Sequence, residues 1–423
     1  MKKIRLRTSI TLDTVLLYIG LFCVTTYAFL EPVSATIYVF WAIKIPLLIA
    51  AAVCLVPQIG LLFRVLRRKN YFYAMLSVVV LCLLLAWSML MNRDASIGIS
   101  PLRRTFRMVM YMAELFLYMI IMAETGRGKQ VVNYLFWYML LMAVMNDVLM
   151  FSGVIRFRDG RFETYLMGTK FSVAYLHMNL LTMWFVRQKQ RLRRVRFAKL
   201  KVLLAAVYII AVCIRVDVVS GMLGCLVLVF LFFYADKPKG RKLLKLASPN
   251  VLVLTIVVSI VFAFVANWLV GIPAIRFVVE DVLKRDATIT GRLNIYEDFT
   301  ANMQGHWMAG YGLGNGNDVT ERLFGYENVQ NGVLDWVLQV GVFATGALLS
   351  VMVVVFRQLS RRRGKLLISL MPLVCLVYMY IILGMIETTL NMCFFLWLAL
   401  IFLLANERHP ELQQPVPQAL TDN

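Results

Sequence analysis

The chain has 423 residues, of which 61% are hydrophobic and 16% are charged, and its mean hydropathy is +0.75. A soluble domain is usually about half apolar and about a quarter charged, so this composition excludes an ordinary soluble enzyme, a disordered protein and a nucleic-acid-binding module. The 44 Lys and Arg residues outnumber the 23 Asp and Glu residues, giving a formal net charge of +21. In so apolar a chain this excess predicts the cytoplasmic loops of a membrane protein, which attract membrane lipids, rather than a nucleic-acid partner.

Apolar runs recur along the whole chain and predict an all-α polytopic membrane protein with about twelve transmembrane helices and a large, partly helical extracytoplasmic loop. The runs cover residues 15–30, 35–56, 71–91, 105–122, 131–153, 169–186, 202–214, 221–234, 251–272, 331–356, 366–387 and 391–405. We therefore expect transmembrane helices 1–9 within residues 1–272, the extracytoplasmic loop at 273–330, transmembrane helices 10–12 within 331–405, and a cytoplasmic tail at 406–423.

The distribution of basic residues predicts the orientation. With the N-terminus inside, the inside connections hold 29 Lys and Arg residues and the outside connections hold 14. Because Lys and Arg favour the cytoplasmic side, both termini are expected in the cytoplasm. Cysteine and histidine form no ligand pattern, since the seven cysteines lie in apolar runs without a CxxC pair and the three histidines are scattered. The sequence predicts no metal and no cofactor.

The loop at 273–330 is the first place to look for an active site, because long ordered loops are usually functional. It carries 5 basic and 8 acidic residues in a basic protein. Thr288 or Thr290 can cap a helix that runs to about Met303, with Arg292 and Tyr296 on one face. Arg292 would lie in the first turn, where the helix dipole disfavours a cation unless it meets an anion. Phosphate binding and a local salt bridge both remain open for it.

Two further patterns follow. Glycines at 310, 312, 314 and 316 form either a nest of backbone amides around an anion or a plain irregular turn. Asn331, Asp335 and Gln339 are spaced four apart and place polar groups on one stripe of a span. Ionisable residues predicted toward the outer leaflet suit a site that opens to the outer face, although each could instead form a structural pair between helices. They are Asp147, Arg215, Asp217, Asp335 and Glu387.

Three motifs in and after the loop resemble a known series. They are Thr290-Gly-Arg-Leu-Asn-Ile-Tyr296, the Gly-Tyr-Gly-x-Gly-Asn turn at 310–315, and Gln330-Asn-Gly-Val-Leu-Asp-Trp followed by Gly341. In this order they resemble the O-antigen ligase and polymerase superfamily, particularly the Wzy-type capsule and exopolysaccharide polymerases of Gram-positive bacteria. The motifs cover about 50 residues, and the rest of the chain matches by hydropathy alone.

The resemblance implies a glycosyltransferase of the bacterial cell membrane with a loop over a lipid-facing cavity. Such an enzyme polymerises oligosaccharide repeat units carried on undecaprenyl pyrophosphate, and it would work beside a flippase and a chain-length regulator. Arg292 matches the family's loop arginine, and Arg215 looks like its other external arginine; both would bind pyrophosphate. Gln330 stands where the ligase branch has histidine, so that histidine's role does not carry over and the likeness tilts toward polymerase.

The transfer requires that the pyrophosphate charge be neutralised and that the two substrates be aligned. A carboxylate that accepts the acceptor's hydroxyl proton would help, and Glu327, Asp335 and Asp147 are the candidates. The remaining candidate substrate-binding residues lie in the loop and at its end: Tyr296, Tyr311, Gly312, Gly314, Asn328, Gln330 and Asn331.

Three other functions fit the composition. A ligase-like transferase would move finished glycan to another acceptor, but position 330 lacks the histidine of that branch. A flippase or transporter would have charged side chains along a central cavity. Only Lys44 and Glu114 support this function. A purely structural scaffold would leave the buried charges unexplained.

Overall fold

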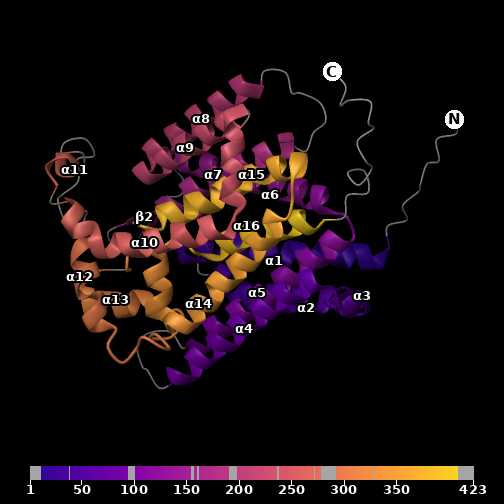
Figure 1. The fold of residues 1–423 in the computed structure, drawn as a ribbon, viewed down its shortest axis with the longest axis horizontal. Coiled ribbons are helices and arrows are strands. Elements are labelled where there is room, and N and C mark those ends of the chain that lie inside the picture. Colours follow the sequence, from indigo (N-terminus) through magenta and orange to yellow (C-terminus); the bar gives the residue numbers. More distant parts are fainter. Residues whose placement is uncertain are drawn as a thin grey trace.

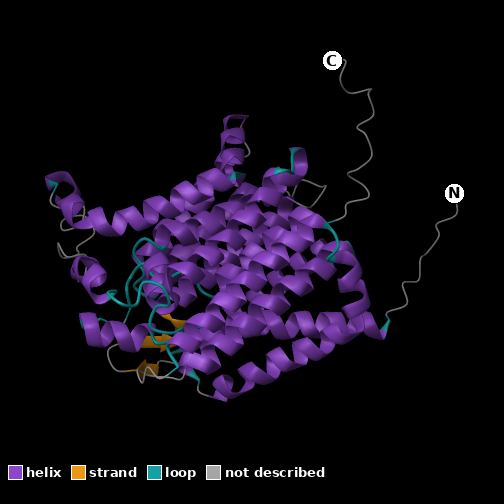
Figure 2. Ribbon diagram, turned by 60° about the horizontal axis from the view of Figure 1, so that its bottom comes forward, coloured by secondary structure: helices purple, strands orange, loops and turns teal. Residues whose placement is uncertain are grey.

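The computed structural model describes residues 11–407 apart from residues 38, 94–100, 154–156, 160–161, 190–197, 236–237, 271, 278–291 and 327. Within this part the chain is almost entirely helical (Figure 2). The helical bundle contains α1 (Leu12–Thr36), α2 (Val39–Leu55), η1 (Val56–Gln58), α3 (Ile59–Val65), α4 (Lys69–Met91), α5 (Pro101–Glu124), α6 (Gly128–Ser152), α7 (Lys170–Lys189), α8 (Ala198–Arg215), α9 (Val219–Ala235), η2 (Pro238–Ala247), α10 (Pro249–Val270), α14 (Gly332–Ser360), α15 (Gly364–Leu383) and α16 (Met392–Asn406).

Eight helical stretches of the described chain are long and apolar enough to cross a membrane, as suits a multi-pass membrane protein. They are Leu12–Val33, Val39–Val65, Lys69–Met91, Pro101–Glu124, Gly128–Ser152, Pro249–Ala266, Gly332–Ser360 and Leu366–Leu383. The expected number of about twelve is therefore not reached. The four expected runs that fall short correspond to α7, α8, α9 and α16.

The physical reasons for the shortfall differ. Helix α16 has 15 residues, and at 1.5 Å per residue its length of about 22 Å is less than the ~30 Å of a bilayer core. Its side chains from Phe394 to Ala405 are all buried, as expected of a helix that is apolar on every face and lies inside a bundle. Helix α7 is less apolar because it carries the buried polar residues His177, Asn179 and Thr182.

A small antiparallel sheet departs from the purely helical prediction. It follows α6 and consists of β1 (Phe157–Asp159), β2 (Phe162–Tyr165) and β3 (Gly168–Thr169) in the order β1-β2-β3. Figure 2 shows it at the edge of the helical bundle. Gly168 (φ +89°) approaches the backbone of Pro32 so closely that a side chain would collide with it, and this contact ties the sheet to the end of α1.

The loop at 273–330 is partly helical, as predicted. It contains α11 (Pro273–Phe277), α12 (Arg292–Asn302) and α13 (Gly316–Phe324), and the predicted helix ending near Met303 corresponds to α12. Figure 1 shows α12 and α13 beside the end of α10. Phe299, Met303 and Val329 form part of a separate small hydrophobic core under this loop, so the loop is packed rather than open.

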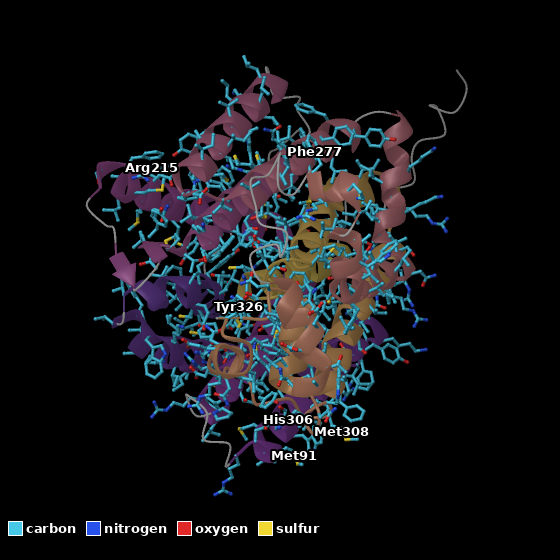
Figure 3. All side chains as sticks on the ribbon, turned by 90° about the vertical axis from the view of Figure 1, so that its left-hand side faces the viewer. Met91, Arg215, Phe277, His306, Met308 and Tyr326 are labelled. Atoms are coloured by element: carbon cyan, nitrogen blue, oxygen red, sulfur yellow. The ribbon has the colours of Figure 1, made fainter. Side chains whose placement is uncertain are left out.

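The bundle has two chemically different ends. At one end, which we call the basic end, Gln358 and Arg361 bond to Asn70, and the Gly128 amide bonds to Glu407. At the other, which we call the loop end, Ser88 Oγ at the finish of α4 donates to the Ala309 carbonyl at 2.5 Å. Met91, His306 and Met308 lie near one another there (Figure 3).

Helix α14 is broken at Gly341, whose backbone has φ +75° and ψ 176°. The loop takes up the backbone groups that the break frees. Tyr311 N donates to Leu338 O at 2.9 Å, Gly312 N donates to Gln339 O at 2.8 Å, and Val342 N donates to Trp307 O at 2.9 Å. Because unsatisfied backbone groups are costly in a membrane-spanning helix, the glycine-rich turn and the broken helix depend on each other.

Replacing Gly341 by alanine should lower the free energy of unfolding by about 3 kcal/mol, because its φ is left-handed and a Cβ there would overlap the Met308 carbonyl. The measurement is reversible unfolding of the purified protein in detergent. Gly346→Ala in the same helix is the matched control, since open space surrounds its Cβ position; it should be neutral or stabilise by up to about 1 kcal/mol. Equal effects of the two changes would contradict the break as a constraint.

Candidate functional site

A cavity of about 220 Å³ lies at the loop end, and we call it the first cavity. Its walls come from segments that are distant in sequence: the end of α1, the starts of α5, α14 and α16, and the glycine-rich turn. The lining residues are Tyr27, Glu31, Arg104, Arg107, Met108, Leu313, Gly314, Gly332, Asp335, Trp336, Gln339, Thr388, Leu390, Asn391, Met392 and Phe395. Charged groups and large apolar side chains thus share one site.

Three helices begin at the first cavity. Helix α5 starts at Pro101, α14 starts at Gly332 after its cap Asn331, and α16 starts after its cap Asn391. A helix N-terminus carries a partial positive charge that favours anions, although the caps Asn331 and Asn391 already accept from amides of α14 and α16. Arg104 and Arg107 lie in the first two turns of α5, where they add two full charges of the same sign.

The Arg104 side chain packs against the glycine-rich turn. Gly314 has φ +95°, and a Cβ there would overlap the aliphatic part of Arg104. The Gly314 amide donates to Gln339 Oε1 at 2.8 Å. Arg104 Nε is buried and has no hydrogen-bond partner within the described part of the chain. Because buried polar atoms are nearly always bonded, this nitrogen is available to donate to a group that enters the cavity.

Arg107 is held more rigidly. It is buried, its Nε donates to Arg103 O at 3.4 Å, and its guanidinium lies 5.6 Å from the centre of the Trp41 ring. Stacking on an aromatic face and bonding to the preceding turn fix the orientation of the planar fork. Both arginines are therefore placed by their surroundings rather than extended freely into solvent.

Two carboxylates border the first cavity among the described residues. Asp335 Oδ2 accepts from Gln339 Nε2 at 2.7 Å. Glu31 accepts from Lys44 Nζ at 2.5 Å, and the side chain of Lys44 is 3% exposed whereas that of Glu31 is 33% exposed. Lys44 thus balances the charge of Glu31. Asp335 is then the one carboxylate of the described lining that remains to balance the two arginines. The surplus of positive charge, together with the helix starts, makes the first cavity a candidate anion site.

The predicted residues of the loop divide into two groups. Asp335 and Gly314 line the first cavity, and Gly312 lies next to it against Pro101. Tyr296 is buried, and its hydroxyl donates to Gln330 O and Met385 O at 2.9 and 3.1 Å. This tyrosine therefore fastens the loop to the connection before α16, and no face of its ring is presented to a sugar in this arrangement.

Tyr311 also packs the loop. Its hydroxyl donates to Asn302 O at 2.5 Å, and its ring stacks on His306 with centroids 3.8 Å apart. Burial raises the pKa of the Tyr311 hydroxyl above its ordinary value, so it remains a neutral donor at physiological pH. The contact joins the end of α12 to the glycine-rich turn.

The polar residues before α14 shape its start. Asn328 Oδ1 accepts from Gln330 N at 2.9 Å, and Gln330 has φ 56°. Asn331 is the N-cap of α14, since its Oδ1 accepts from Val333 N and Leu334 N at 3.0 and 3.1 Å. This capping accounts for the asparagine without a ligand. The predicted polar stripe is thus a cap followed by Asp335 and Gln339, which are the members that reach the cavity.

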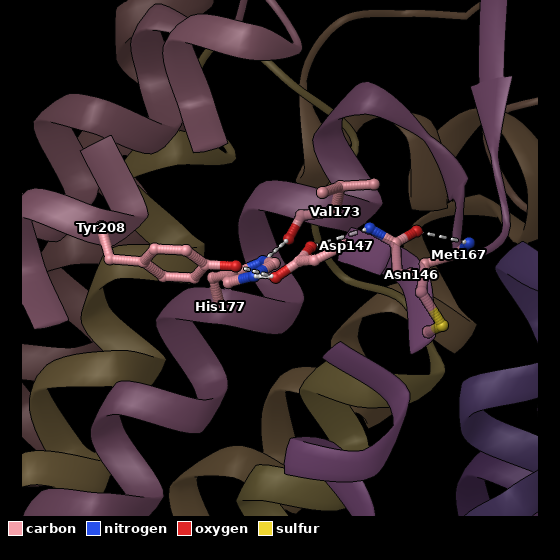
Figure 4. A network of polar contacts seen from close by, with 6 residues as sticks. All are labelled: Asn146, Asp147, Met167, Val173, His177 and Tyr208. Atoms are coloured by element: carbon pink, nitrogen blue, oxygen red, sulfur yellow. Dashed lines mark hydrogen bonds and ion pairs between the residues drawn. The ribbon is translucent and has the colours of Figure 1, made fainter. Parts of the chain in front are cut away.

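Asp147 belongs to a different, buried network, shown in Figure 4. Its Oδ2 accepts from Tyr208 OH at 2.6 Å and faces His177 Nε2 at 2.9 Å, while Asn146 Nδ2 donates to Oδ1 at 3.2 Å. His177 Nδ1 lies 2.8 Å from the Val173 carbonyl, which can only accept. Nδ1 therefore carries a hydrogen. Every polar atom of the Asp147 carboxylate is bonded, as in an interhelical structural pair.

Of the three other predicted residues, the structure fully describes one. Arg215 is the last residue of α8 and stands apart from Tyr326 and His306 in Figure 3. It does not belong to the lining of the first cavity. Arg292 is the first residue of α12, but its side chain is outside the described part of the structure. Glu327 lies wholly outside the described residues.

Sequence reasoning missed Arg104, Arg107 and Glu31. The signal was the cluster at 103–107, three arginines in a connection predicted to lie outside, where basic residues are disfavoured. Glu31 carried no such signal, because its role depends on Lys44 and on two helices that meet only in the fold. No protein-family model matches the chain, and no curated protein matches it.

The Asp147 network should contribute to stability. Asp147→Ala leaves His177 Nε2 and Tyr208 OH without their partner in a buried site, which should cost about 3 kcal/mol of unfolding free energy. Tyr208→Phe removes one donor and should cost about 1 kcal/mol. Both are measured by unfolding in detergent. Wild-type stability in the Asp147→Ala protein, combined with lost activity, would instead place Asp147 in the reaction.

Proposed function

We propose that the chain is a membrane glycosyltransferase that polymerises undecaprenyl-pyrophosphate-linked oligosaccharide repeat units into a surface polysaccharide. One observation carries the proposal: two fixed arginines and three helix starts surround a single cavity at the loop end. Pyrophosphate is a dianionic or trianionic group with several acceptor oxygens, and Arg presents a planar fork of donors that matches it. Two of the three motifs that resemble the Wzy-type polymerases, the glycine-rich turn and the segment that begins at Gln330, contribute residues to the same walls.

The chemistry of the first cavity supports this substrate. Met108, Trp336 and Phe395 are apolar and border the same space as Arg104 and Arg107. A lipid pyrophosphate needs both surfaces, because its charged head must meet cations while the first part of its chain stays out of water. In the reaction the arginines would stabilise the charge that grows on the leaving pyrophosphate, which is a large source of catalysis in a preorganised site.

The two ends of the bundle support an orientation. Several arginines lie at helix ends that face away from the loop. They are Arg68 before α4, Arg187 in the last turn of α7 and Arg361 after α14. By the positive-inside rule this end would face the cytoplasm, which puts both termini inside and the first cavity at the outer face of a bacterial cell membrane. We expect a flippase to supply the lipid-linked units there and a chain-length regulator to act on the same product.

A transferase explains the architecture better than a flippase. The first cavity is bordered by the starts of helices at one end of the bundle. The buried aromatic and aliphatic side chains of α16, including Phe395, Trp397 and Phe402, occupy the middle. A flippase needs a path for a charged head group through that middle.

Arg104→Gln and Arg107→Gln should each weaken undecaprenyl pyrophosphate binding at least about tenfold, since a charge-assisted hydrogen bond contributes roughly 1.5–3 kcal/mol. They should also abolish the glycan ladder that the purified protein makes from lipid-linked repeat units isolated from its own source cells. Binding is measured by native mass spectrometry, and the ladder by gel electrophoresis.

Two controls sharpen this experiment. Arg361→Gln at the basic end should leave both readouts unchanged, and so should Arg215→Gln if the first cavity is the site. A ladder lost with Arg215→Gln but kept with Arg104→Gln would move the site to the end of α8. Lipid transfer across a vesicle bilayer without any ladder would replace the polymerase by a flippase, and transfer of one finished glycan to a different acceptor would replace it by a ligase.

A further inference from the structure

A second cavity of about 380 Å³ adjoins the first, and we call it the second cavity. Glu31, Thr388, Asn391 and Met392 line both. The rest of its wall comes from the starts of α7 and α13, from the end of α15 and from the small sheet. The two cavities therefore meet along one shared strip of wall at the loop end.

The second cavity differs from the first in chemistry. No basic side chain is among the described residues that line it, whereas hydroxyl, amide and aromatic groups are frequent. They include Ser172, Tyr175, Asn179, Asn317 and Tyr380. Neutral donors and acceptors beside aromatic rings suit a sugar, which offers many hydroxyl groups and apolar C–H faces, and they do not suit a phosphate.

The wall of the second cavity is preorganised. Tyr380 OH accepts from Asn179 Nδ2 at 2.9 Å and donates to Asn179 Oδ1 at 3.1 Å. Tyr175 bonds to Glu387, and the rings of Tyr175 and Tyr380 lie 5.4 Å apart. Tyr175 and Asn179 lie on α7 and Tyr380 lies on α15. Side chains on helices hold their geometry better than side chains on a free loop.

Glu31 stands at the junction. Among the described carboxylates, it alone borders both cavities, because Asp335 borders only the first. Lys44 holds one oxygen of Glu31 at 2.5 Å. That contact orients the carboxylate, and a third of the side chain remains accessible. A carboxylate fixed in this way can accept a proton from a hydroxyl that approaches from the second cavity.

We propose that the second cavity binds the acceptor sugar of the incoming repeat unit and that Glu31 is the general base. The inference rests on the proposed function. The acceptor hydroxyl oxygen forms a bond to the anomeric carbon of the donor, and its proton passes to the Glu31 carboxylate. The bond between the anomeric carbon and the pyrophosphate oxygen breaks, and its electron pair leaves with undecaprenyl pyrophosphate, whose charge Arg104 and Arg107 balance. Glu31 later returns its proton to solvent.

The decisive comparison is Glu31→Gln against Asp335→Asn, each a carboxylate-to-amide change at the first cavity. Glu31→Gln should slow ladder formation at least about a hundredfold, as expected for loss of a general base. Its affinity for undecaprenyl pyrophosphate should stay within about threefold of wild type. Asp335→Asn should slow the ladder far less. Glu31→Asp should restore part of the rate, because it keeps the carboxylate.

A second variant tests the acceptor site and leaves the ion pair between Glu31 and Lys44 unchanged. Ser172→Trp should fill the second cavity and stop the ladder while undecaprenyl pyrophosphate still binds the first cavity. Thr169→Trp is the matched control, because Thr169 is exposed three residues earlier and does not line either cavity; it should polymerise normally.

The outcomes separate the two proposals. A wild-type rate in Glu31→Gln or in Ser172→Trp would overturn the acceptor site and the base, while the polymerase itself would stand. A wild-type protein that neither binds undecaprenyl pyrophosphate nor makes a ladder would overturn the proposed function, and this inference with it.

Discussion

The break of α14 at Gly341 is the constraint on which the loop end depends. Breaking a helix frees backbone carbonyls and amides that must be bonded inside a membrane protein. Here Trp307, Tyr311 and Gly312 of the loop supply those bonds. The same bonds set the position of the glycine-rich turn, and with it the place where Gly314 meets Arg104. Close backbone approach accounts for the glycines at these contacts.

Once the turn is fixed, electrostatics decides what the first cavity can hold. Placing Arg104 and Arg107 in the first turns of a helix is unfavourable for α5 alone, because the dipole repels cations there. The starts of α14 and α16 point to the same space and increase that cost. An anion between them would convert all of these repulsions into attractions. Under the proposed function, binding of the pyrophosphate would therefore also stabilise the fold.

Much of the fold followed from the sequence, and the site followed only in part. Hydropathy identified the helical runs, and the turn chemistry identified the helix ending near Met303 and the polar stripe at Asp335 and Gln339. Hydropathy overestimated the number of membrane spans, because an apolar run of 15 residues such as α16 can be a core helix as well as a membrane crossing. Arg104, Glu31 and Lys44 lie on three separate helices, and no spacing rule connects residues that only tertiary packing brings together.

Asp147 and Arg104 show how a structural charge differs from a functional one. From sequence both are ionisable residues near the end of a predicted helix. In the structure, Asp147 has a partner for each oxygen, so protein alone accounts for it. Arg104 keeps a buried nitrogen without a partner, at the wall of a cavity. Because folding rarely leaves such a group unbonded, Arg104 keeps a donor that a group entering the first cavity can use.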